Sequence, residues 1–360
     1  MLPHYAIVVP KLGAVALDPL IRIGRLDTLH PGYYVGLVAR HRFQRRGTRE
    51  SARTISHGER IPKMAASQPD RPLLDVGSLG VWCPQLRTRD QAKAKVVAAG
   101  LEELGVAAIW IPGGTGGAIF DHVTYALRAT QHVAIATGVL NMLMHEPLAT
   151  AQWFATMEAE HPGRLVLGLG ASHAKQAADV GVPYQPMIAT RDYLDRLDAA
   201  PDPVPRGRRL LGALGPRMLE LAQLRTAGAH TYIVNPIHTR QAREILGPNR
   251  FLAPVVKIVL EPDPILAAAI ARNHLAPYLE LPTYRRSLSR MGYTEADLAN
   301  TGSDRLVADL FVLGDAAAVR DPITAHKEAG ADHVCVQVVT AHRQGVPWDG
   351  WRAVATAAVA

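Results

Sequence analysis

The sequence has little cysteine and lacks the short motifs of several common catalytic chemistries. Among its 360 residues only Cys83 and Cys335 are cysteines, and they stand too far apart for a metal-ligand spacing. There is no HExxH, CxxC or Walker sequence, and no Ser-His-Asp order is evident. The absence of these motifs gives no support for metal catalysis. The scarcity and wide separation of the cysteines predict two buried free thiols in a reducing cytoplasm.

Long hydrophobic runs are lacking as well. No apolar run reaches the roughly 18 to 20 residues that a membrane-spanning helix needs. The apolar stretch 5–16 is interrupted by Pro10 and Lys11 and has no small-residue cleavage site, so it is a poor signal peptide. We therefore expect a cytoplasmic protein without membrane contact.

The basic excess lies almost entirely in the first 70 residues. The net charge is +7, and residues 1–70 hold 11 Lys and Arg against 5 Asp and Glu, which leaves 28 against 27 for the rest. The segment has no steady hydrophobic period and lacks the interleaved aromatic residues of single-strand binders. We predict a poorly ordered basic extension over 1–72, with no specific nucleic-acid partner.

From Gly77 onward, apolar runs alternate with helical patterns, and a longer polar insertion spans 279–305. Eight strand–helix units favour a closed parallel barrel over an open sheet. The fold class is therefore predicted as α/β, a (β/α)8 TIM barrel over 73–360. The predicted strands are 79–84, 107–111, 132–140, 165–169, 210–214, 230–235, 251–260 and 332–339, and the predicted helices are 89–104, 120–130, 147–161, 190–198, 217–226, 238–246, 263–278 and 315–328.

The stretch 161–173, HPGRLVLGLGASH, combines a buried strand with polar residues directly after it. Catalytic groups of (β/α)8 barrels lie at the carboxyl ends of the strands, so His173 is a candidate proton donor or shuttle. Gly168 and Gly170 either allow close packing or bring the backbone near a cofactor ring. A third glycine and a suitably placed acidic residue are missing, which argues against a dinucleotide-binding motif.

The stretch 213–219, ALGPRML, couples a predicted strand to a helix start. Gly215 and Pro216 form the turn, and a proline loses no needed hydrogen bond in the first helical turn. The positive end of the helix dipole makes this turn a candidate anion site, with Arg217 either a phosphate partner or a solvated side chain.

Other residues allow two interpretations. His145 lies in a loop and is either a surface residue or a second acid–base candidate. Trp82 and Trp110 lie close to the ends of the first two predicted strands and can pack in the core or against a ligand ring. Cys83 and Cys335 fall on the first and last predicted strands, which become neighbours in a closed barrel. A disulfide between them is therefore geometrically conceivable, although free thiols remain the default.

Several segments together resemble the bacterial luciferase-like oxidoreductases. The resemblance is closest to the branch that uses the deazaflavin coenzyme F420 and is common in mycobacteria and related actinobacteria. It covers about 75–360 and excludes 1–70. The segments that carry it are WIPGG (110–114), VAIATGVLNM (133–142), HPGRLVLGLGASHA (161–174), LLGALGPRMLELA (210–222), GAHTYIVNP (228–236) and GADHVCVQV (330–338).

The resemblance implies a barrel that holds a flavin-like ring at its strand ends. It places a non-proline cis peptide at Gly138–Val139, under the ring, and further ring contacts at Gly170 and Ser172. The phosphate site of the family matches the start of the helix after the fifth strand; its residues here are Gly215, Pro216, Arg217 and Met218.

The chain also departs from the family pattern. Related deazaflavin dehydrogenases often carry an acidic or histidine residue after the second strand, where this chain has the glycine-rich loop 113–117. The sugar-phosphate dehydrogenases have a glutamate after the fourth strand, where this chain has His173. Sugar-phosphate oxidation is therefore not expected.

The leading hypothesis is an F420-dependent oxidoreductase that moves a hydride between the deazaflavin and an unidentified small-molecule substrate. His173 is the first candidate proton donor and His145 the second. One alternative is an FMN-dependent monooxygenase that uses molecular oxygen. Another is a non-catalytic barrel that only binds the cofactor. The resemblance also suggests a homodimer.

Overall fold

The structure is a computed structural model that describes residues 74–114, 117–315, 317–341 and 345–359. The predicted basic extension, 1–72, lies outside the described residues. None of the helices in these ranges is both long and apolar enough to cross a membrane.

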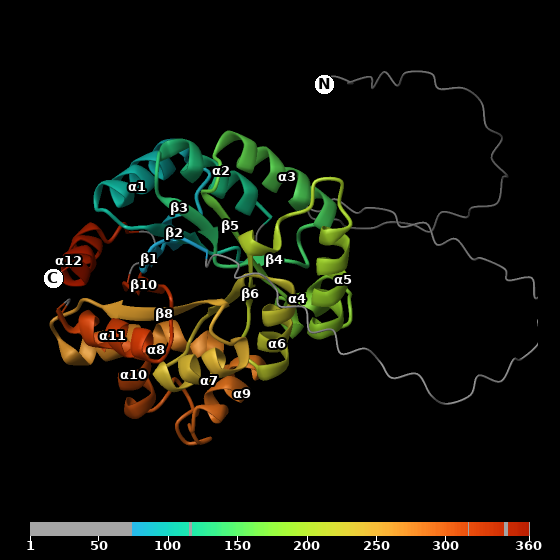
Figure 1. Ribbon diagram of the computed structural model, residues 1–360. Helices are drawn as coiled ribbons and strands as arrows, with labels where there is room; N and C mark the ends of the chain where they lie inside the picture. The colour runs from blue at the N-terminus through green and yellow to red at the C-terminus, as the bar shows by residue number, and fades with distance from the viewer. Residues whose placement is uncertain (1–73, 115–116, 316, 342–344, 360) are drawn as a thin grey trace, which may run out of the picture. The chain divides into compact units, whose positions relative to one another are not determined.

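Eight parallel strands form a closed barrel, as the sequence predicts (Figure 1). The ring runs β1-β2-β3-β5-β6-β7-β8-β10, and it closes because β10 pairs with both β8 and β1. The barrel strands are β1 (Leu79–Trp82), β2 (Ala108–Ile111), β3 (Ala134–Thr137), β5 (Leu165–Gly170), β6 (Arg209–Gly212), β7 (Gly228–Thr231), β8 (Phe251–Val259) and β10 (Val334–Val338).

Two short strands extend the barrel at its carboxyl end. The predicted strand 132–140 is divided into β3 and β4 (Leu140–Asn141), and β4 pairs separately with β5. Strand β8 is long, so its first residues pair with β7 and its last with β9 (Phe311–Leu313). Strand β9 is absent from the sequence prediction because only this extra length of β8 gives it a partner.

Helices cover the outside of the barrel (Figure 1). Proline occupies the first turn of α3, α5, α6, α7, α8 and α9, where its missing N–H is not needed and its fixed φ suits the helix start. The helices are α1 (Gln91–Glu103), α2 (Ile119–Ala129), α3 (Pro147–Glu160), α4 (Ala174–Asp179), α5 (Pro186–Asp198), α6 (Pro216–Arg225), α7 (Pro236–Leu246), α8 (Pro264–Leu279), α9 (Pro282–Arg290), α10 (Asp304–Leu310), α11 (Arg320–Glu328) and α12 (Trp348–Val359).

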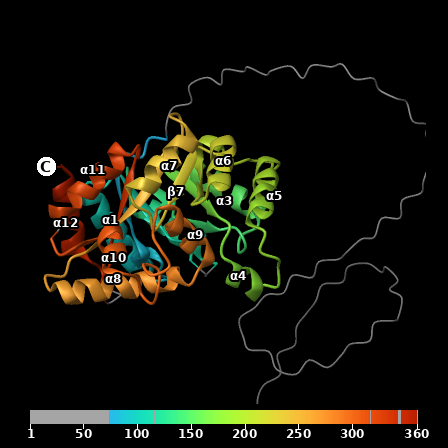
Figure 2. The same ribbon diagram turned by 90° about the horizontal axis from the view of Figure 1, so that it is seen from below.

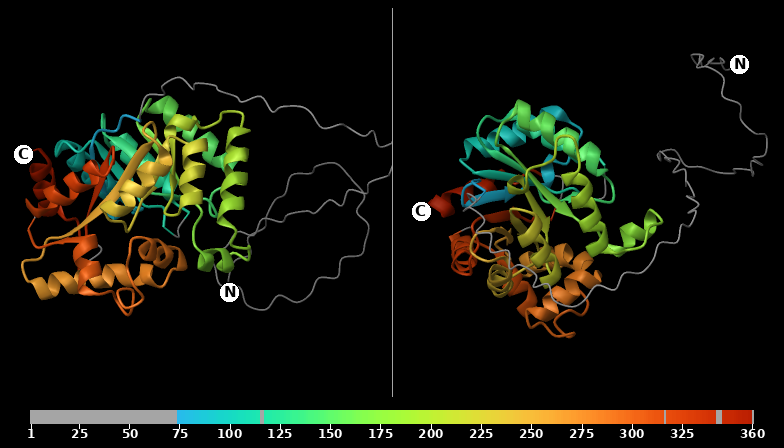
Figure 3. Two further views of the ribbon diagram at one scale, coloured as in Figure 1. Left: turned by 60° about the horizontal axis from the view of Figure 1, so that its bottom comes forward. Right: turned by 45° about the vertical axis from the view of Figure 1, so that its right-hand side comes forward.

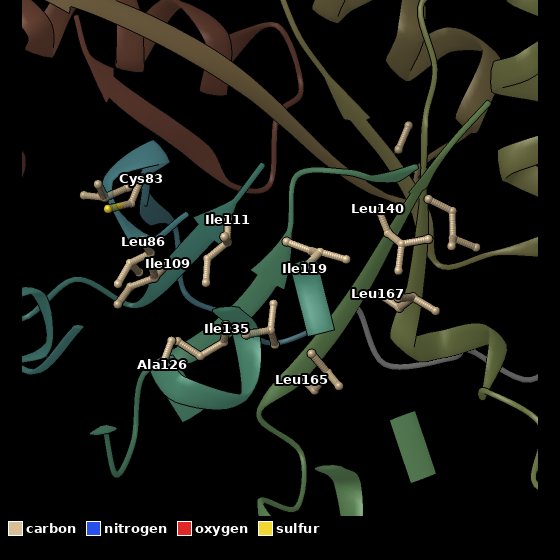
Figure 4. Packing of buried hydrophobic residues seen from close by; sticks show 14 of the residues in the cluster. Cys83, Leu86, Ile109, Ile111, Ile119, Ala126, Ile135, Leu140, Leu165 and Leu167 are labelled. Atoms are coloured by element: carbon tan, nitrogen blue, oxygen red, sulfur yellow. The ribbon is translucent and has the colours of Figure 1, made fainter. Parts of the chain in front are cut away.

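Alternate strand residues face two different cores. Outward residues such as Ile109, Ile135 and Leu167 pack against the surrounding helices, and Figure 4 shows them beside Ile119 of α2. Inward residues are mostly small, except for Trp110 and a few others, and they fill the barrel interior. Small inward side chains leave room at one end of the barrel for a cavity.

The segment predicted as a polar insertion, 279–305, contains structure of its own. It forms α9 and leads into α10, and both pack with α8 around a second apolar core that includes Tyr284, Leu288 and Met291. Figure 2 shows α8, α9 and α10 grouped together, and the left view of Figure 3 shows α8 and α9 apart from the helices that run alongside the strands. The apolar positions of α9 are hidden among arginines and serines, which explains the missed helix.

Both cysteines are free and buried. Burial raises the pKa of Cys83 to about 12 and raises that of Cys335 well above its usual range. Because the thiolate is the reactive form, we expect the native protein to react with a thiol reagent at pH 8 at less than about one-hundredth of the rate of the denatured chain. Rapid labelling of either cysteine in the native protein would contradict this burial.

Candidate functional site

A cavity of about 1110 Å³ opens at the carboxyl ends of the barrel strands. Its walls come from the turns after β1, β2, β3, β5 and β6, from β7 and β10, and from α8 and α9. This is the end of the barrel at which the sequence analysis places the site. A volume of this size accommodates a ring cofactor together with a small substrate.

The turn Gly138–Val139 forms one wall of the cavity and contains a cis peptide bond, as the resemblance predicts. The backbone N–H of Gly138 donates to the carbonyl of Ile111 at 2.8 Å, and the carbonyl of Val139 accepts from Gly113 N–H at 3.2 Å. The indole Nε1 of Trp82 donates to the carbonyl of Gly138 at 3.1 Å. These contacts fix the turn between three strands.

Glycines surround Val139 and make room for it. A Cβ built on Gly170 lies 2.4 Å from Cγ2 of Val139, and one built on Gly168 lies 2.1 Å from the carbonyl oxygen of Thr137. A Cβ built on Gly113 lies 2.3 Å from the carbonyl oxygen of Val139. The glycines of this strand therefore serve close packing. Gly170 also lines the cavity, so its backbone stays available to a ligand.

Ser172 and His173 follow β5 and line the cavity. Ser172 has φ 64°, and its hydroxyl hydrogen-bonds Gln176. His173 is the N-cap residue of α4, and its ring lies 5.9 Å from that of Tyr284. Burial lowers the pKa of His173, which favours a neutral imidazole able to accept a proton.

His145 does not line this cavity. Its buried ring packs against Phe120 at 4.7 Å, and burial lowers its pKa. Of the two histidines predicted as acid–base candidates, the structure brings only His173 to the cavity.

The start of α6 forms another part of the cavity wall. Gly215, Pro216, Arg217 and Met218, the residues that the resemblance proposes for a phosphate site, all line it. Pro216 occupies the first helical turn, and the backbone N–H groups of Met218 and Leu219 bond the carbonyl of Gly215. The positive end of this helix dipole therefore faces a pocket rather than bulk solvent.

Two arginines that the sequence analysis missed join Arg217 at this wall. Arg286 and Arg290 come from α9 and line the same cavity. Arg290 donates to the carbonyl of Leu214 at 3.2 Å, which anchors α9 to the turn before α6. Burial lowers the pKa of Arg290, and Arg286 lowers it further, so the two guanidinium groups are close enough to repel. An anion at this place relieves that repulsion.

The described walls of the cavity carry four arginines and no carboxylate. The fourth, Arg87, follows β1, whereas Arg217 follows β6 on the opposite side of the ring of strands. No group of three or more His, Cys, Asp or Glu in the described part of the chain is arranged to hold a metal ion. The electrostatics of this cavity therefore suit an anionic ligand.

A row of aromatic rings crosses the cavity wall. Trp82 stacks on Tyr232 with a centroid distance of 5.2 Å, Tyr232 meets Tyr278 at 5.4 Å, and Tyr278 meets Tyr284 at 5.0 Å. Tyr284 then lies against His173. Of these residues only Trp82 and His173 were predicted from the sequence, because the three tyrosines come from the turn after β7 and from α8 and α9.

Polar groups from several elements also line this cavity. Tyr232 donates its hydroxyl hydrogen to Oε1 of Gln337 at 2.8 Å, and its oxygen lies 3.0 Å from Nε2 of His274. His230 also lines the cavity; it stacks on Trp110 at 4.4 Å, and burial lowers its pKa to about 3. His230 and Tyr232 alternate along the segment 228–232, and this spacing is the sequence signal that could have marked the face toward the cavity.

Residues 79–200 match the family model described as luciferase-like monooxygenase. No functionally curated protein sequence matches the chain significantly. Over these residues the match confirms the predicted resemblance to the luciferase-like proteins, and it supports an enzyme of the oxidoreductase class.

Solved structures of the same fold cover most of the barrel. An F420-dependent secondary alcohol dehydrogenase, bound to an F420–acetone adduct, is 16% identical with a TM-score of 0.61 and covers 78% of this chain and 98% of its own. The F420-dependent tetrahydromethanopterin reductase of Methanopyrus kandleri is 17% identical with a TM-score of 0.57 and covers 78% of this chain and 97% of its own.

An oxygen-using enzyme shares the fold equally well. The oxygenating constituent of 3,6-diketocamphane monooxygenase of Pseudomonas putida, in complex with FMN, is 13% identical with a TM-score of 0.57 and covers 78% of this chain and 96% of its own. At these identities the likeness establishes the fold alone, a luciferase-like TIM barrel.

Proposed function

We propose that this chain, an oxidoreductase of the luciferase-like type, transfers a hydride between the deazaflavin coenzyme F420 and a small organic substrate. One observation carries the proposal. A single cavity at the barrel mouth joins the Gly138–Val139 turn, the arginine-flanked start of α6 and the half-buried His173, and its described walls hold no carboxylate.

The residues present fit such a cofactor. The Gly138–Val139 turn offers a flat backbone surface for the ring, with Gly170 and Ser172 beside it. The start of α6, from Gly215 to Met218, offers a phosphate site. A bound deazaflavin supplies a ring carbon that accepts or gives a hydride.

The number of arginines favours F420 over FMN. Arg217, Arg286 and Arg290 gather at the start of α6, and none of them has an ion-pair partner among the described residues. FMN carries one phosphate, whereas F420 carries a phosphodiester and further carboxylates. Guanidinium groups bind both phosphates and carboxylates, so three of them match the more highly charged ligand.

Charge neutralisation at this wall is directly testable. We expect Arg217→Ala and Arg290→Ala each to weaken F420 binding about tenfold to hundredfold, with a smaller effect at high salt, because each removes a partner for an anion. Arg240→Ala, on the exposed face of α7, is the matched control. Equal affinities for all three variants, measured by fluorescence titration, would argue against an anion site at α6.

His173 is the proposed acid–base group. In its neutral form it accepts the hydroxyl proton of a substrate as the carbon-bound hydrogen leaves as a hydride, and it returns that proton in the reverse reaction. Its position beside Tyr284 keeps it at the cavity wall rather than in bulk solvent.

A comparison of two variants distinguishes the two candidate proton donors. We expect His173→Ala to lower the rate of F420 reduction by an active alcohol about 10²-fold to 10⁴-fold while leaving the Kd for F420 unchanged. His145→Gln should change the rate little, because His145 lies outside the cavity. Full activity in His173→Ala, or loss only in His145→Gln, would reassign the proton donor.

The second candidate is an FMN-dependent monooxygenase, since the same fold holds FMN in one of the compared structures. Mixing the protein with either reduced cofactor and oxygen distinguishes the two. Oxygen consumption coupled to product formation with FMN supports the monooxygenase. Reversible hydride exchange between F420 and an alcohol, without oxygen uptake, supports the proposal.

The cellular setting is also part of the proposal. Two free buried thiols are typical of a protein in a reducing cytoplasm. We also propose that the protein is a homodimer, as the family resemblance suggests.

A further inference from the structure

A buried lysine lies inside the barrel close to the cavity. Lys257 belongs to β8, and its side chain is 1% exposed. Its Nζ lies 4.1 Å from the centroid of the Tyr232 ring and 5.9 Å from that of Phe311. Within the described residues, no carboxylate oxygen lies within ion-pair distance of this nitrogen. The barrel therefore encloses an amino group that lies against two aromatic rings.

Such an arrangement is unfavourable unless something compensates for it. Buried charges in proteins are normally paired, because removal from water strongly disfavours the ionised form. A tyrosine ring offers only partial compensation through its quadrupole. Burial accordingly lowers the pKa of Lys257 to about 7. An isolated interior lysine in this position points to a negative charge supplied from outside the chain.

Tyr232 connects this lysine to the cavity. Its ring covers Nζ and also lines the cavity, and it stacks on Trp82, whose indole holds the carbonyl of Gly138. Two side chains, Trp82 and Tyr232, therefore connect Lys257 to the turn at which a ring would bind. Among the described cavity residues none is acidic, so the field of the ammonium group reaches this space without local cancellation.

The titratable groups around Lys257 are otherwise neutral or basic. Burial holds the pKa of Tyr232 well above its usual range, so its hydroxyl stays protonated and bonded to Gln337. His274 and Tyr278 also contact that hydroxyl. Among the described residues, His230 and His326 also lie within electrostatic reach of Lys257. Burial lowers the pKa of His230 to about 3 and that of His326 to about 4, and Lys257 makes a smaller contribution to both.

We infer that Lys257 is a positioning residue that, through Tyr232, stabilises the negatively charged reduced form of the ring bound at the Gly138–Val139 turn. The inference rests on the proposed function. In substrate oxidation the electron pair of the substrate C–H bond moves with its hydrogen to the ring, the hydroxyl proton moves to His173, and the ring gains one negative charge. Lys257 keeps its proton and balances that charge, which favours the reduced cofactor and the oxidation of substrate.

The test compares the affinities of the oxidised and reduced forms of whichever cofactor, F420 or FMN, the full-length protein binds. The readout is the ratio of the two Kd values at pH 6, measured anaerobically by fluorescence. We expect Lys257→Met to lower the preference for the reduced form about tenfold and to leave the affinity for the oxidised form within about twofold. Arg240→Ala, which removes a positive charge from the exposed face of α7, is the control for the loss of a charge outside the barrel interior. An unchanged ratio in folded Lys257→Met overturns the inference.

The wild-type protein provides a second measurement that needs no variant. The preference for the reduced form, corrected for the titration of the free cofactor, should fall about tenfold between pH 6 and pH 9 as Lys257 loses its proton. A corrected ratio that is independent of pH overturns the inference. If wild-type protein binds neither cofactor, the proposed function itself fails, which is a different result from cofactor binding without a Lys257 effect.

Discussion

Replacing Gly170 with alanine is expected to destabilise the barrel by about 2 to 3 kcal/mol and to weaken cofactor binding more than tenfold. The added Cβ lies 2.4 Å from Cγ2 of Val139, a separation that atoms in a packed core do not adopt, so Val139 must move. Because Val139 belongs to the turn that forms the cavity wall, its movement changes the proposed ring surface. Urea unfolding and fluorescence titration measure the two effects.

A second substitution identifies the cause. In Val139→Ala/Gly170→Ala the clashing Cγ2 is gone, and the nearest remaining atom, Cβ of residue 139, lies at an ordinary 3.6 Å. The double variant should regain most of the lost stability and affinity, giving a large coupling energy in a double-mutant cycle. Gly207→Ala, where a Cβ meets nothing within 4 Å, is the neutral control. Additive effects at positions 139 and 170 would show that the two do not share this space.

The free energy of unfolding is expected to fall by roughly 6 kcal/mol between pH 7 and pH 5. Burial lowers the pKa of His230 to about 3 and those of His326 and His333 to about 4. In the unfolded chain each titrates near 6.5, so below that pH these three histidines bind up to three more protons in the unfolded state than in the folded state. Stability is thus full above pH 6.5 and is lost as the pH falls toward 4.

His230 offers a clean test of this account. Its ring stacks on Trp110 and makes no hydrogen bond of normal geometry, so His230→Phe keeps the stacking and removes one titrating group. The variant should lose about one-third less stability between pH 7 and pH 5. Denaturant unfolding at pH 7, 6 and 5 gives both slopes. Stability that does not change over this range, or identical slopes for the two proteins, would mean that the histidines are protonated in the folded protein.

The barrel was predictable because its strands are short apolar runs separated by helices of regular period. Leu165–Gly170, for example, is a short apolar run closed by glycine, a pattern that favours an interior strand, and the structure buries it at every position. Strand β9 and helix α9 were missed for physical reasons. The former exists only because β8 is unusually long, and the apolar positions of α9 are few and lie among arginines and serines.

The site was predictable where one contiguous segment carries it. The turn into α6 and the residues after β5 lie on the cavity wall where the sequence places them. Tyr232, Tyr284 and Arg290 were not identified, since they reach the cavity from separate elements that only the tertiary structure brings together. The two readings of Gly170 were equivalent in the sequence. Only the position of Val139 reveals that this glycine makes room for a neighbouring side chain.

The most direct test of the central claim is a fluorescence titration of the full-length protein with F420 and, in parallel, with FMN. We predict a micromolar or tighter Kd for F420 and an affinity for FMN at least about tenfold weaker. Three arginines lie at the start of α6, and they match a ligand that carries several negative charges. Tighter binding of FMN, or no binding of either cofactor at millimolar concentration, would contradict it.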